Sequence, residues 1–191
     1  MYRNRQFRFL LGVGLVIVLL AILFIVIFTR GSSAPPTHLP RPMASYSTDP
    51  TAQVAMLIDG PVNAISEHNQ VQVVVTNSNT TINIFQGYND QVIRSSVYPM
   101  DEAAFHVFLR SLESAAFNSG SNDPSLSQAS GYCPTGDRYI FSFNVDGRQL
   151  ERYWTTSCGG THTYNGNLNL TVTLFEAQVP DYVNLISGIN I

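Results

Sequence analysis

The longest uninterrupted hydrophobic stretch of the chain begins at Phe9 and ends at Phe28, and it contains no charged residue and no proline. At 1.5 Å of rise per residue, a helix of this length spans about 30 Å, the thickness of a bilayer's hydrocarbon core. A secretory signal peptide has a shorter apolar region of about 7–15 residues. We therefore predict an uncleaved transmembrane signal anchor over residues 9–28, with cleavage near Ala34 as the alternative.

Further along the chain the pattern changes to the alternation and β-branched composition that are typical of strands. Residues 71–76, 81–86 and 92–98 show it, and short turn sequences separate them. We expect these segments to form a three-stranded antiparallel meander.

A β-hairpin is predicted over residues 138–145 and 148–155, because Asp146-Gly147 between two alternating runs is a strong signal for a tight turn. An uninterrupted register from this turn places Phe141 opposite Arg152 and brings Cys133 close to Cys158. The only two cysteines of the chain therefore lie together at the open end of the hairpin.

Two helices are expected before the hairpin. Asp49 and Pro50 are typical of a helix start, so we predict a short helix over residues 50–58. Asp101 is the expected N-cap of a longer helix, which ends near residues 118–120. Its apolar stripe consists of Phe105, Phe108, Leu109, Leu112 and Ala116.

The C-terminal segment is ambiguous over residues 168–178. Leu168, Leu170, Val172 and Leu174 alternate as in a strand, whereas the composition before Pro180 favours a helix begun by Asn169 or Thr171. We expect the helix. A last short amphipathic segment contains Tyr182, Leu185, Ile186 and Ile189.

The predicted fold class is α+β, with an antiparallel sheet formed by the meander and the cysteine-bracketed hairpin and covered by two helices. We divide the chain into a cytoplasmic tail (residues 1–8), the anchor (9–28), a stalk rich in proline and serine (29–48) and an extracytoplasmic domain (49–191).

Charge indicates both the orientation and the excluded partners. Arg3, Arg5 and Arg8 precede the anchor, which by the positive-inside rule places the N-terminus in the cytoplasm and the domain outside. Beyond the anchor region, six arginines against thirteen acidic residues leave a formal charge of −7. Nucleic-acid binding requires a basic surface, so we exclude it.

Cys133 and Cys158 are predicted to form a disulfide, because an exported domain favours cystine. One alternative is a hydrolase in which Cys158 is the nucleophile and His162 the base; another is a metal site made by these cysteines and His162. Neither has the further ligand or partner that its chemistry requires, and we expect no metal and no cofactor. We interpret His38, His68 and His106 as solvated side chains.

Paired carboxylates of a glycosidase would have to come from a few acidic residues, and nothing in the sequence sets two of them across a cleft. These residues are Asp137, Asp146, Glu151, Glu176 and Asp181.

Two polar loops, residues 119–131 and 159–166, flank the predicted disulfide and are the candidate contact surfaces. The candidate contact residues are Arg152, Tyr153, His162 and Tyr164. For the aromatic side chains of the hairpin, core packing is the competing interpretation.

The layout of tail, anchor, stalk and small domain resembles that of uncharacterised single-pass proteins of the bacterial cell envelope. The segments Cys133-Pro134-Thr135-Gly136, Thr156-Ser157-Cys158-Gly159 and Gln178-Val179-Pro180-Asp181-Tyr182 look like its signature positions. The order of elements also resembles small α+β protease-inhibitor domains, in topology only. The expected function is a non-enzymatic binding or structural module held in the cytoplasmic membrane, with an envelope or extracellular protein as partner; protease inhibition is an alternative.

Overall fold

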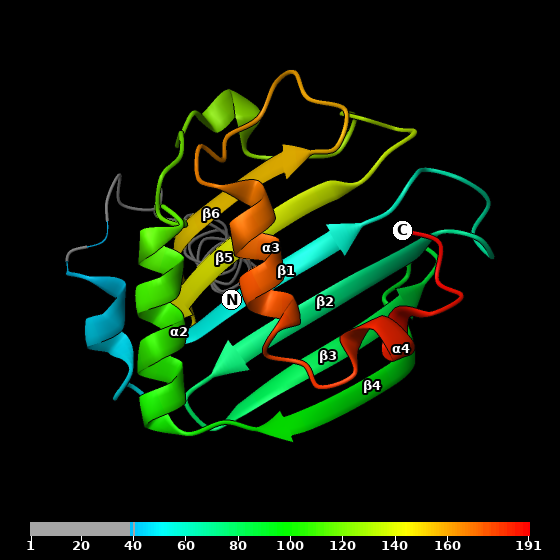
Figure 1. The fold of residues 1–191 in the computed structure, drawn as a ribbon. Coiled ribbons are helices and arrows are strands. Elements are labelled where there is room, and N and C mark those ends of the chain that lie inside the picture. The colour runs from blue at the N-terminus through cyan, green and yellow to red at the C-terminus, as the bar shows by residue number, and fades with distance from the viewer. Residues whose placement is uncertain (1–38, 40) are drawn as a thin grey trace, which may run out of the picture. The chain divides into compact units, whose positions relative to one another are not determined.

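The computed structural model describes Leu39 and residues 41–191, which form an α+β fold with one six-stranded antiparallel sheet (Figure 1). The strand order is β4-β3-β2-β1-β5-β6. The strands are β1 (Gln53–Asp59), β2 (Asn69–Thr76), β3 (Asn79–Gln86), β4 (Gln91–Pro99), β5 (Arg138–Val145) and β6 (Arg148–Thr156). The predicted meander and the predicted hairpin are both confirmed.

The predicted helix over residues 50–58 is wrong, because this segment contains β1, one of the two central strands. Val54, Met56 and Ile58 are buried on one face, and β1 pairs with β2 on one side and β5 on the other. Asp49 caps a turn instead: its carboxylate accepts hydrogen bonds from the Thr51 amide and hydroxyl at 2.9 and 2.7 Å. Pairing on both edges outweighs the local helix signal.

The helices gather on the face of the sheet that Figure 1 presents to the viewer. Asp101 caps α2 (Glu102–Ser114) as predicted, with its carboxylate 2.7 Å from the Ala104 nitrogen. The helix ends before the predicted stop: Ala116 has a positive φ of 57° and is exposed, and Phe117 takes its place in the core.

The C-terminal segment is helical, as expected. Asn167, rather than Asn169 or Thr171, caps α3 (Leu168–Glu176) by accepting from the Leu170 nitrogen at 3.1 Å. The short helix α4 (Tyr182–Ile186) follows.

Aromatic side chains form the centre of the core between the helices and the sheet. The Phe141 ring of β5 lies 4.6, 5.8 and 6.4 Å, between centroids, from those of Tyr164, Phe117 and Phe175. Phe175 belongs to α3, so one cluster joins the hairpin to the helix layer. Such offset and edge contacts add about 0.5–1.5 kcal/mol each beyond burial.

A β-bulge changes the predicted hairpin register. The pairing shifts next to Phe143, so Phe143 faces Glu151, and Phe141 faces Tyr153 rather than Arg152. One extra residue on β6 moves every side chain beyond it to the other face of the sheet. Tyr153 therefore enters the core, while Trp154 lies on the opposite face.

The folded domain begins before the predicted boundary at residue 49. A 3-10 helix, η1 (Met43–Tyr46), lies within the predicted stalk, yet Met43 and Tyr46 are 0% and 3% exposed and belong to the core. The predicted anchor and tail lie outside the described residues. Within the described part, no helix is long and apolar enough to cross a membrane.

Candidate functional site

The predicted disulfide between Cys133 and Cys158 is confirmed, with a Cα–Cα distance of 5.7 Å. Next to it, the Ser157 nitrogen donates to the Asp137 carbonyl and the Ser157 hydroxyl accepts from the Asp137 nitrogen, both at 2.9 Å. The hydrolase and metal-site alternatives need a free Cys158 thiolate, which the disulfide removes.

The two loops flanking the disulfide pair with each other. We define the loop platform as residues 119–131 together with residues 157–166. Gly120 forms a β-bridge with Tyr164, and the Ser121 nitrogen donates to the Thr163 carbonyl at 2.8 Å. The Thr163 and Tyr164 nitrogens also donate to the Trp154 carbonyl at 2.9 Å. The platform thereby covers part of the β6 edge, which would otherwise leave backbone groups unpaired.

Trp154 and Arg152 fix the first loop from the sheet face opposite the helices. The Trp154 indole nitrogen donates to the Leu126 carbonyl at 2.6 Å, and its ring lies 4.8 Å from that of Tyr132. An Arg152 guanidinium nitrogen donates to the Ser127 carbonyl, also at 2.6 Å. Burial lowers the pKa of Arg152. Arg152 therefore positions the loop backbone rather than pairing with an acid.

Two of the predicted contact residues are not on the surface. Tyr153 is 1% exposed and its hydroxyl donates to the Glu151 carboxylate; Tyr164 is 3% exposed, with its hydroxyl 2.6 Å from that of Thr171. Burial raises the pKa of both tyrosines. Core packing, the competing interpretation for the hairpin aromatics, is correct for Tyr153; the prediction of Tyr164 as a contact residue is wrong because its side chain is buried.

His162 is exposed at the tip of the second loop, in a run of exposed residues from Ser157 to His162. Its Nδ1 lies 2.6 Å from the Gly160 carbonyl, and Gly159 and Gly160 both have positive φ angles. The loop platform thus combines a fixed base with an exposed tip.

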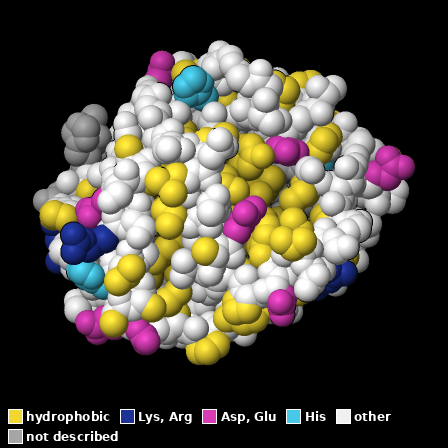
Figure 2. Space-filling model, viewed as in Figure 1, with side chains coloured by type: hydrophobic (Ala, Val, Ile, Leu, Met, Phe, Trp, Pro, Cys, Tyr) yellow, Lys and Arg dark blue, Asp and Glu magenta, His cyan; other side chains and the backbone are white. Residues whose placement is uncertain are grey.

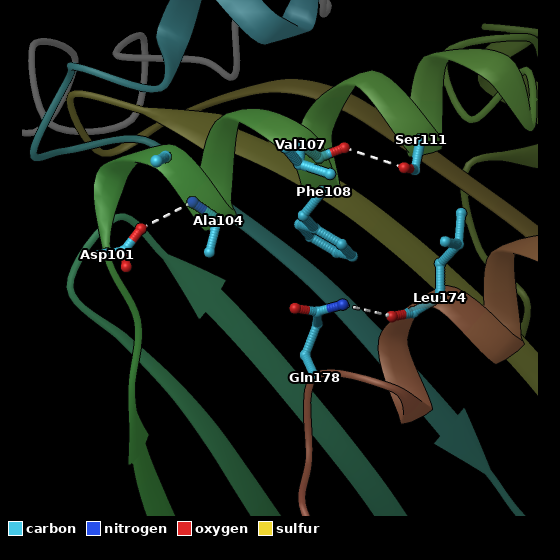
Figure 3. Close-up of a pocket in the computed structure, with 8 residues that line it drawn as sticks. Asp101, Ala104, Val107, Phe108, Ser111, Leu174 and Gln178 are labelled. Atoms are coloured by element: carbon cyan, nitrogen blue, oxygen red, sulfur yellow. Dashed lines mark hydrogen bonds between the residues drawn. The ribbon is translucent and has the colours of Figure 1, made fainter.

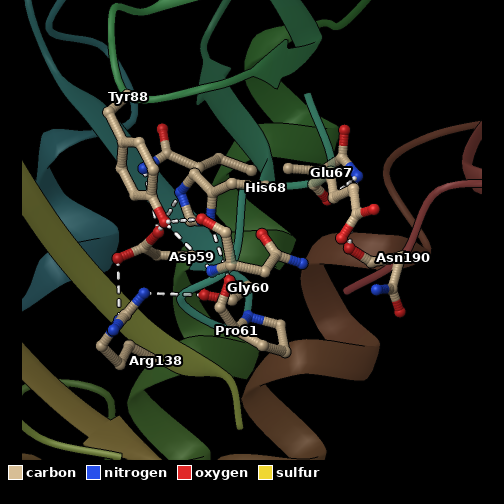
Figure 4. Close-up of polar contacts among 11 residues, drawn as sticks. Asp59, Gly60, Pro61, Glu67, His68, Tyr88, Arg138 and Asn190 are labelled. Atoms are coloured by element: carbon tan, nitrogen blue, oxygen red, sulfur yellow. Dashed lines mark hydrogen bonds and ion pairs between the residues drawn. The ribbon is translucent and has the colours of Figure 1, made fainter. Parts of the chain in front are cut away.

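A buried polar cluster, which the sequence did not reveal, crosses one end of the sheet (Figure 4). Arg138 Nε donates to Asp59 Oδ2 at 2.8 Å, and His68 Nε2 lies 3.1 Å from Asp59 Oδ1 without hydrogen-bond geometry. His68 is 0% exposed and stacks on Tyr88, with ring centroids 4.1 Å apart, so the prediction of a solvated His68 is wrong. With its imidazole closed to solvent, we assign His68 a structural role.

A groove of about 480 Å³ lies between α2 and α3 (Figure 3). Its polar groups are used locally: Ser111 donates to the Val107 carbonyl and Gln178 to the Leu174 carbonyl. Phe108 supplies apolar surface between them. The groove contains no arrangement of side chains that indicates chemistry.

Among Leu39 and residues 41–191, no three His, Cys, Asp or Glu side chains gather closely enough to hold a metal ion. In comparisons with known proteins, no family model matches the chain and no curated protein matches its sequence.

Proposed function

We propose that the protein is a membrane-anchored binding module, displayed outside the cytoplasmic membrane, that contacts another envelope protein through its loop platform and performs no catalysis. Two features support this location. The hydrophobic sequence from Phe9 to Phe28 fits a signal anchor, and a disulfide persists in oxidising compartments outside the cytoplasm.

The observation that carries the binding role is the construction of the platform. Its two loops are joined by the Gly120–Tyr164 bridge, fixed to Trp154, and closed at their base by the disulfide. Preorganised loops lose less conformational entropy on binding than free ones. Exposed residues at the tip, including His162, are therefore presented to a partner in a defined arrangement.

Site-specific photocrosslinking in native membranes tests this role. The full chain carries benzoylphenylalanine at His162, or at Val107 as the control; Val107 is 62% exposed on α2 and outside the platform. We expect a discrete crosslinked species from position 162 and none from position 107. Equal crosslinking from both positions, or none from position 162, would contradict the proposal.

A further inference from the structure

Four polar side chains meet where the start of β5 faces the turn between α3 and α4. We call Asp137, Tyr139, Glu176 and Tyr182 the acid–tyrosine cluster. The Tyr139 hydroxyl donates weakly to Asp137 Oδ2 at 3.5 Å. Burial raises the pKa of both tyrosines, and the Glu176 carboxylate raises it further; Tyr139 also raises the pKa of Tyr182. The sequence contained these acids but did not place them together.

Tyr182 has a polar group that lacks a partner. The residue is 7% exposed, and its buried hydroxyl has no hydrogen-bond partner among the described residues. Nearly all buried polar atoms in folded proteins are hydrogen-bonded, so such an atom calls for an explanation. Glu176 and Tyr139 both act on this hydroxyl electrostatically, which places it beside the cluster.

Neither Asp137 nor Glu176 forms an ion pair with a cationic side chain among the described residues. Burial raises the pKa of Glu176, and no hydrogen bond from the described residues offsets this effect. Burial likewise raises the pKa of Asp137, although Tyr139 and Arg138 act in the opposite direction. The Arg138 guanidinium is already bound to Asp59 and to the Gly60 carbonyl.

The surroundings of the cluster are apolar. Figure 2 shows hydrophobic side chains gathered on this face with acidic side chains among them, while the basic side chains lie at the margins. Leu185 and Ile186, which share α4 with Tyr182, and Ile189 beyond them are only partly buried. Lysine and arginine combine an aliphatic stem with a cationic head, so they match an apolar floor that carries carboxylates.

We propose that the acid–tyrosine cluster binds a lysine or arginine side chain of a partner polypeptide. The carboxylates of Asp137 and Glu176 neutralise the cationic head, the Tyr182 hydroxyl gains a partner, and the tyrosine rings contact the stem and the cation. The formal charge of −7 beyond the anchor region favours approach of a basic surface. The site lies outside the loop platform, although the Asp137 backbone is hydrogen-bonded to Ser157 at the start of the platform's second loop.

Saturation-transfer-difference NMR with the full chain in an uncharged detergent tests the proposal. The probe is the peptide acetyl-Gly-Ser-Lys-Ser-Gly-amide, and the control peptide has norleucine in place of lysine. We expect saturable transfer to the lysine side chain only. Glu176→Gln, which keeps the side chain's shape, should weaken binding about tenfold, since a charge-assisted hydrogen bond is lost.

The matched variant Glu67→Gln removes the same charge from an exposed position and should leave binding unchanged. Asp137→Asn serves as a second variant at the site if Glu176→Gln does not fold. Three outcomes would overturn the proposal: equal binding of the lysine and norleucine peptides, no saturable binding at all, or an equal loss of binding in Glu176→Gln and Glu67→Gln. The proposal would also be overturned if millimolar Ca²⁺ displaced the peptide from the wild-type chain but not from Glu176→Gln, because the cluster would then be a metal site.

Discussion

Removing the disulfide should destabilise the domain by a calculable amount. Cys133 and Cys158 are separated by 25 positions, so the bond closes a loop of about 26 residues. The chain-entropy relation gives about 3.5 kcal/mol of stabilisation for such a loop at 25 °C. The double variant Cys133→Ala/Cys158→Ala should therefore lose about 3.5 kcal/mol of unfolding free energy. This loss is a large part of the 5–15 kcal/mol that is typical of the free energy of unfolding of a domain.

Urea unfolding of a fragment spanning residues 35–191, followed by circular dichroism, measures this loss. The wild-type fragment in reducing buffer should match the double variant within about 0.5 kcal/mol, and the reductant should not affect the variant. A loss below about 1 kcal/mol would refute the reasoning, because the unfolded chain would then gain little freedom from the reduced cysteines. A reductant effect on the double variant would show that the loss has another cause.

Three other substitutions test the packing and the electrostatics. Trp154→Phe removes the indole hydrogen bond to the loop 119–131, and should speed amide exchange there while leaving β1 protected. Met56→Ala, at a 0% exposed site in β1, should lower the free energy of unfolding by about 2–5 kcal/mol in a urea titration. Leu57→Ala, on the other face of β1, should lower it clearly less. The pKa of Glu176 is raised in the folded state, so the free energy of unfolding falls as pH rises and the carboxyl ionises. Glu176→Gln removes this ionisation and should make the free energy of unfolding less dependent on pH between pH 4 and pH 7.

Features controlled by neighbouring residues could be predicted from the sequence. Asp101 caps α2 through an amide three residues away, and the Asp146-Gly147 turn joins β5 to β6 with both residues at positive φ. The disulfide followed from that turn together with the cysteine positions: both cysteines lie beyond the ends of β5 and β6, so the bulge within the hairpin does not separate them.

Features controlled by distant residues could not be predicted. Val54 and Ile58 fit both a helical and a strand periodicity, and pairing with β2 and β5 decides between them. The bulge beside Phe143 has no glycine to mark it, yet it decides that Tyr153 is buried. His68 stands in a polar sequence and is buried because Asp59 of β1 and Tyr88, in the turn between β3 and β4, pack against it.

Asp137 connects the disulfide to the acid–tyrosine cluster. Its backbone is fixed by two hydrogen bonds to Ser157, the neighbour of Cys158, and its side chain belongs to the cluster. A partly buried carboxyl with a raised pKa opposes folding at neutral pH, whereas asparagine would fill the same space without a charge. The Asp137 carboxyl thus lowers the stability of the folded domain at a position held in place beside the disulfide. Such a loss of stability is expected at a binding site that needs the charge. Asp137→Asn should therefore stabilise the fragment at pH 7 and weaken binding of the lysine peptide by the full chain. A destabilised variant would show instead that the carboxylate stabilises the fold.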